Sequence, residues 1–169
     1  NVQAGSLELA GSSTHKGASS IADGAELILG GSATHEVTSS ASFAGPGATR
    51  LRATLAGSED ATIGSPFIWS TGTITGTDPS VSLRLTGPTT FDSTLGITLD
   101  GRTLDLDTDS VWTGGSFFLR DGAVVNNLAG RTFTINGGQY VQQTAFSTAP
   151  PQFYNQGTLI MSGDPSTST

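Results

Sequence analysis

The sequence predicts an all-β fold, a right-handed parallel β-helix (β-solenoid), on three observations. Strand-forming residues such as Thr, Val, Ile and Phe are frequent, whereas strong helix formers such as Lys and Met are scarce. Short segments alternate apolar and polar residues, and one segment recurs further along the chain. An antiparallel β-sandwich is the alternative, because short strands separated by turn residues also fit that architecture.

The clearest repeat relates residues 5–20 to residues 25–40. A period near 20 residues suits one coil of a solenoid, in which equivalent positions stack. Turn residues recur together with apolar ones, which favours stacked coils over hairpins. At an offset of 20 the identical residues are Leu7/Leu27, Leu9/Leu29, Gly11/Gly31, Ser12/Ser32, Thr14/Thr34, His15/His35, Ser19/Ser39 and Ser20/Ser40.

Later segments keep this pattern of short alternating strands followed by Gly or Asn-Gly. In residues 132–135 the two apolar side chains face one way and the two threonines the other. The same alternation is found in Leu83/Leu85, Leu95/Ile97/Leu99 and Leu104/Leu106. We therefore predict a single solenoid domain over residues 1–163 and a flexible tail over 164–169. Residues 41–66 depart from the pattern, and we expect a loop insertion there.

Composition excludes several functional classes. The net charge is −7 and only 12% of residues are charged, so no basic stripe for nucleic acid is present. No run of about 18 apolar residues could span a membrane as a helix. The chain has no cysteine, which excludes a disulfide framework. Low charge with abundant Gly, Ser and Thr favours a secreted or cell-surface location.

Three sequence segments resemble the repeats of large bacterial surface and exported proteins. They are Val111-Trp-Thr-Gly-Gly, Asp121-Gly-Ala-Val-Val-Asn-Asn-Leu-Ala-Gly and Tyr154-Asn-Gln-Gly-Thr-Leu-Ile-Met-Ser-Gly. These repeats occur in autotransporter passengers and in filamentous-haemagglutinin-like adhesins. The resemblance extends over roughly residues 105–163 and implies a parallel β-helix with a stalk, adhesive or matrix role.

An acidic strand is the first candidate site. Asp105, Asp107 and Asp109 fall on one face of a strand, and Leu104 and Leu106 fall on the other. Three carboxylates in a row could bind Ca²⁺, which prefers several oxygen ligands. Paired carboxylates also serve glycoside hydrolysis. A solvated strand face is the favoured interpretation, calcium the second and a hydrolase pair the third.

Aromatic residues are candidates for binding glycans or a partner. Trp69 and Trp112 occupy matching positions in two similar segments, and Tyr140 and Tyr154 flank a Pro-rich stretch. Exposed aromatic rings stack on sugars, whereas tryptophans within a repeat can equally fill a core. Burial is the favoured interpretation for the two tryptophans. Exposure of both would favour glycan binding.

The two histidines of the repeat suggest a possible metal site. If His15 and His35 stack one coil apart, their rings lie about 5 Å from each other. A third ligand would still be needed, and a solvated turn copied with the repeat is the favoured interpretation.

No nucleophile elbow, Walker loop or zinc-protease motif is present in the sequence. We therefore expect no enzyme, no cofactor other than possible calcium, and an extracellular structural or adhesive module. Such a module would be a stalk, a fibre or a surface-layer subunit, and it could self-associate into fibres. The alternatives are a carbohydrate-binding module for cell-surface glycans and a fragment of a β-helix polysaccharide lyase or hydrolase.

Overall fold

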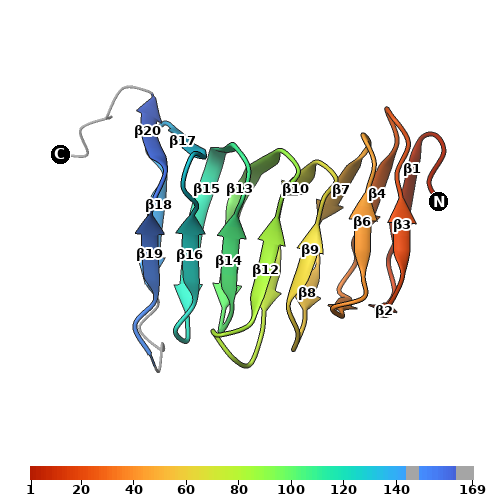
Figure 1. Cartoon of the computed structure of the whole chain (residues 1–169), viewed down its shortest axis with the longest axis horizontal. Helices are drawn as coiled ribbons and strands as arrows, with labels where there is room; N and C mark the ends of the chain where they lie inside the picture. The colour runs from red at the N-terminus through yellow and green to blue at the C-terminus, as the bar shows by residue number, and fades with distance from the viewer. Residues whose placement is uncertain (144–148, 163–169) are drawn as a thin grey trace.

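The computed structural model describes residues 1–143 and 149–162, which form strands and no helix. These strands wind into a β-solenoid of about seven coils, and each coil pairs in parallel with the next. Figure 1 shows the rungs side by side along the long axis, with the first and last labelled strands, β1 (Ser6–Leu9) and β20 (Thr158–Ser162), at opposite ends of the shaft. The predicted parallel solenoid is confirmed, and the sandwich alternative is wrong. The predicted tail, 164–169, lies outside the described residues.

Three faces run along the shaft. The first face contains β1 (Ser6–Leu9), β4 (Glu26–Leu29), β7 (Ala48–Leu51), β10 (Phe67–Trp69), the first halves of β13 (Thr89–Asp100) and β15 (Ser110–Arg120), β17 (Thr132–Asn136) and β20 (Thr158–Ser162). The second contains β2 (Ser13–His15), β5 (Thr34–Val37), β8 (Thr54–Ala56), β11 (Thr73–Thr75), the second halves of β13 and β15, and β18 (Tyr140–Gln143). The third contains β3 (Ala18–Ser20), β6 (Ser42–Ala44), β9 (Ala61–Ile63), β12 (Ser82–Leu85), β14 (Thr103–Leu106), β16 (Val124–Asn127) and β19 (Gln152–Asn155).

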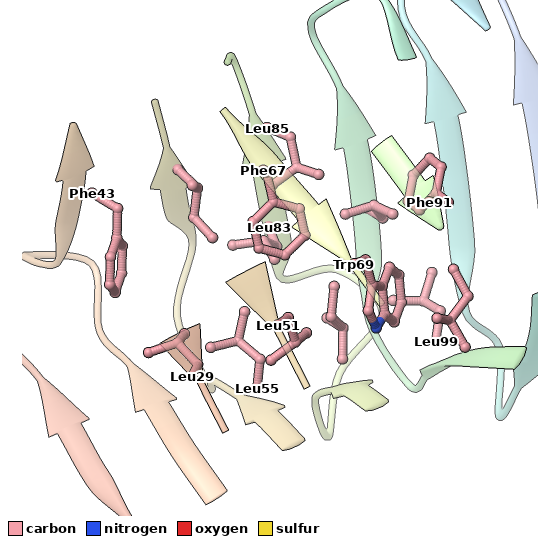
Figure 2. Packing of buried hydrophobic residues seen from close by; sticks show 14 of the residues in the cluster. Leu29, Phe43, Leu51, Leu55, Phe67, Trp69, Leu83, Leu85, Phe91 and Leu99 are labelled. Carbon is pink, nitrogen blue, oxygen red and sulfur yellow. The ribbon is translucent and has the colours of Figure 1, made fainter. Parts of the chain in front are cut away.

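The core consists of columns of inward side chains, one residue from each rung. Alternation sends every second side chain of a strand inward, and parallel register stacks it on its equivalent in the next coil. Figure 2 shows part of this packing between the strands. One column on the first face consists of Leu9, Leu29, Leu51, Trp69, Phe91, Trp112 and Ile135.

The 20-residue repeat matches the spatial register only on the first face. Leu7 pairs with Leu27 and Leu9 with Leu29, as predicted. On the second face His15 lies opposite Val37, and on the third face Ser19 lies opposite Phe43. The prediction that His15 and Ser19 pair with their identical copies is therefore wrong. The first two corners of the second coil are each two residues longer than those of the first, so the offset grows from 20 to 22 and then to 24 residues.

Residues 41–66 were expected to form a loop insertion, but they belong to the regular solenoid. They contain β6, β7, β8 and β9, all of which pair with strands of adjacent coils. The unusual composition of this stretch marks tight corners. Gly45 has a φ of 112°, and a Cβ atom there would lie 2.2 Å from the carbonyl oxygen of Ile21. Only glycine allows so close an approach between coils.

Leu95 departs from the predicted alternation of Leu95, Ile97 and Leu99. Ile97 and Leu99 are buried, whereas Leu95 is 86% exposed. The register between β13 and β15 shifts twice between Phe91 and Gly96: β15 carries one extra residue at the first shift and β13 carries two at the second. This bulge turns the chain from the first face to the second and directs Leu95 outward.

Candidate functional site

The acidic segment has the predicted geometry only at Asp105, because β14 ends at Leu106. The prediction that Asp107 and Asp109 share a strand face with Asp105 is wrong, since both lie in the corner after the strand. Leu104 and Leu106 are fully buried, and Asp105 lies between them on the outer side of β14. The Asp105 carboxylate accepts a hydrogen bond from Asn126 Nδ2 at 2.7 Å. The Asp109 carboxylate accepts one from the backbone N–H of Thr132 at 2.8 Å.

Asp107 is the centre of an ion-pair network that spans three coils. Arg84 donates to Asp107 Oδ2 from Nε and Nη2, at 3.1 and 2.7 Å. Arg131 donates to Asp107 Oδ1 at 2.9 Å. The hydrogen bonds from Arg84 and then Arg131 lower the pKa of Asp107. The sequence analysis missed this convergence, although the spacing of about one coil on either side of Asp107 could have revealed it.

These contacts leave the three aspartates engaged with protein groups. No group of three His, Asp or Glu side chains that could hold a metal ion occurs in residues 1–143 and 149–162. Arg84 and Arg131 are about half exposed, and ion pairs of this kind contribute little to stability. The network therefore links neighbouring coils at the surface of the shaft.

The aromatic candidates separate into two groups. Trp69 and Trp112 are 0% and 1% exposed, so both rings lie in the core. Their burial favours the packing interpretation over glycan stacking. Tyr140 and Tyr154 are 57% and 49% exposed, but they lie on the second and third faces respectively.

A cluster that the sequence analysis did not find joins Ser13, His15 and His35. His35 lies opposite Ser13, so its ring occupies the core column of the second face and is fully buried. The Ser13 hydroxyl lies 2.8 Å from His35 Nδ1 and 3.0 Å from His15 Nε2. His35 Nε2 lies 3.3 Å from the carbonyl oxygen of Gly30. A constant offset of 20 residues does not reveal this arrangement, because the corners of the first and second coils differ in length.

A second buried polar group is Arg102, which is 0% exposed inside the shaft. Its Nη2 donates to the carbonyl oxygens of Glu59 at 2.7 Å and Ser82 at 3.2 Å. Burial lowers the pKa of Arg102 to about 10, although the charge of Asp60 opposes this shift. Gly57 leaves room for the guanidinium, since a Cβ atom there would lie 2.5 Å from Arg102 Nη1.

Two shallow hollows lie on the outer side of the second face and share Glu36 as a lining residue. One has a volume of about 190 Å³ and the other about 350 Å³. A row of outward threonines, in register from coil to coil, runs along the same face: Thr34, Thr54, Thr73 and Thr98. The first hollow is lined mainly by apolar surface, whereas the second presents more polar surface, with hydroxyl groups and the Glu36 carboxylate.

The last described rungs expose apolar side chains. Leu159, Ile160 and Met161 of β20 are 42%, 43% and 73% exposed, and Val141 of β18 is 49% exposed. Residues 132–162 contain no Lys, Arg, Asp or Glu. Charged residues are a common device that prevents edge strands from pairing with other chains, and β17, β18, β19 and β20 carry none.

Comparisons of the chain with protein-family models, with curated proteins and with solved structures found no match. Within residues 1–143 and 149–162 there is no helix of the length and apolarity needed to cross a membrane. The functional argument therefore depends on the geometry of the solenoid itself.

Proposed function

We propose that this chain is an extracellular structural module, without catalysis, that serves as a stalk, fibre or surface-layer subunit. The observation that carries the proposal is a continuous core of stacked rungs ending in an uncharged, apolar rung. Backbone ladders and packed columns make such a shaft stiff along its axis. The resemblance to autotransporter passengers and filamentous-haemagglutinin-like adhesins supports the same role, and the low charge supports a secreted or surface location.

Self-association along the axis is the most direct consequence of this proposal. Among the described strands β20 pairs only with β17, so its other edge offers backbone N–H and C=O groups. Leu159 and Met161 continue the inward columns of Phe133 and Ile135. A second copy can add a parallel strand at this edge and cover both side chains. Strand addition of this kind is a known way in which an exposed sheet edge binds a second chain.

We expect sedimentation velocity to detect concentration-dependent association of the unmodified chain. Met161→Lys places a charge in the apolar column and should abolish this association. Thr158→Lys is the matched control, because it adds the same charge on the same strand at an outward position. The proposal would be contradicted if the unmodified chain stayed monomeric at all concentrations, or if both variants associated equally.

Carbohydrate binding is the second candidate, and the hydroxyl-lined hollow over the first two coils of the second face favours it. Ser12, Thr14 and Glu36 are among the residues that line this hollow, and such groups can hydrogen bond to sugar hydroxyls. Tyr140 lies further along the same face and is exposed. A screen of cell-surface glycans tests this candidate. Binding that is lost in both Glu36→Ala and Tyr140→Ala would establish it, and the absence of any bound glycan would remove it.

A further inference from the structure

We propose that Ser13, His15 and His35 form a proton-ordered hydrogen-bond chain that fastens the first coil to the second and opens at acid pH. The inference depends on the geometry of three side chains on β2 and β5 and does not depend on the proposed function. Ser13 and His15 lie on β2, and His35 lies on β5.

The distances permit one consistent arrangement of protons in the neutral cluster. Gly30 offers only a carbonyl oxygen to His35 Nε2, so this nitrogen must carry the hydrogen and Nδ1 must be unprotonated. The Ser13 hydroxyl then donates to His35 Nδ1. The Ser13 oxygen accepts in turn from His15 Nε2. Both imidazoles are therefore fixed as Nε2–H tautomers, an assignment that follows from the hydrogen-bond network.

An additional proton is unfavourable in this cluster. A proton on His15 places a charge next to the ring of His35, 5.8 Å away, and the ring of Phe43, 5.2 Å away. Burial, and secondarily the charge of His35, lower the pKa of His15.

No carboxylate faces the cluster from the elements packed against it in the described part of the chain. β5 contributes His35 and β6 contributes Phe43. Glu36, the neighbour of His35, is on the opposite, exposed side of β5, and Lys16 is exposed beyond the end of β2. Nothing in this arrangement therefore compensates a positive charge on either ring.

The sign of the pH dependence follows from linkage. When the first coil opens, the His15 imidazole reaches water and binds a proton near its ordinary pKa of about 6.5, whereas burial lowers the pKa of His15 in the closed form. Because the open form binds more protons than the closed form, opening becomes more favourable as the pH falls below about 6.5. At higher pH the neutral cluster of Ser13, His15 and His35 holds β2 against β5. Opening uncovers Leu27, Leu29 and Phe43, which coil 1 otherwise covers.

Hydrogen exchange of the full chain tests the proposal, with rates corrected for intrinsic chemistry. The reporters are amides that bond coil 2 to coil 1, such as Gly30 N–H to Leu9 O and Thr38 N–H to His15 O. Between pH of about 7 and about 5, their protection should fall at least about tenfold. Amides in the middle of the shaft, such as Thr86 N–H to Ile63 O, should not change. Equal protection at both pH values would overturn the proposal.

Two variants and one spectroscopic measurement separate this proposal from general acid destabilisation. His15→Gln keeps a donor for Ser13 without a titrating ring. His35→Leu introduces the residue type that the next coil has at the equivalent position, Leu55. His15→Gln should reduce the acid response at least about threefold, since it removes the titrating His15 ring. His35→Leu should also reduce it, because it removes the neighbouring ring whose charge lowers the pKa of His15. Nitrogen chemical shifts should show Nε2–H tautomers for both histidines of the unmodified chain at neutral pH. An Nδ1–H tautomer of His35, or an undiminished acid response in folded variants, would contradict the proposal.

Discussion

Replacement of Trp69 by alanine should lower the free energy of unfolding by about 3–5 kcal/mol, the range for loss of a large buried aromatic side chain. The ring is fully buried on β10 and contacts Phe91 and Phe117, with centroids 5.9 and 5.6 Å away. Its column runs the length of the first face, so the cavity would interrupt packing between coils that lie on both sides. Urea denaturation followed by circular dichroism measures this effect.

Two controls make the prediction on Trp69 specific. Ile68→Ala changes the adjacent residue, whose side chain points outward and is half buried, and should cost about 1 kcal/mol or less. Trp69→Phe should cost much less than Trp69→Ala, because Phe91 occupies the same column and because Trp69 Nε1 has no hydrogen-bond partner among the described residues. A Trp69→Ala variant within about 1 kcal/mol of the unmodified chain would exclude a tightly packed core.

Arg102→Ala should destabilise the chain by about 3 kcal/mol, because it removes a buried side chain and leaves two carbonyl oxygens without their donor. The affected acceptors belong to Glu59 and Ser82, in the two coils that precede Arg102. The guanidinium therefore links three coils at one corner of the shaft. Urea denaturation again provides the measurement.

Arg84→Ala is the matched control for Arg102. The Arg84 side chain is 51% exposed and pairs with Asp107 on the surface, so its loss should cost about 1 kcal/mol at most. Equal effects of the two substitutions would show that burial of Arg102 has no special structural role. A more stable Arg102→Ala chain would mean that the desolvation of the guanidinium outweighs its hydrogen bonds.

Much of the fold was predictable, because alternation and turn residues are local signals. The pairs Leu83/Leu104 and Leu85/Leu106 stack in register as their patterns indicate, and Trp69 and Trp112 do share one column. The exact register was not predictable from a fixed period. Corners vary in length, so His15 moves away from its apparent equivalent and Ser13 takes the position opposite His35.

The candidate sites were less predictable than the fold for the same reason. Asp105 points outward as expected, but its neighbours come from coils far away in sequence, and those neighbours determine whether a carboxylate is free to bind metal. Arg102 gave no sequence signal of burial, because charged residues are rarely found inside a core. Glycine at position 57, one of many in the chain, makes room for it only through three-dimensional contact.

Electron microscopy of the purified chain tests the central claim most directly, in the presence and absence of calcium. The account predicts narrow rods that lengthen along one axis as concentration rises, with no dependence on calcium. Compact particles of one length at every concentration, or rods that form only when calcium is added, would contradict it.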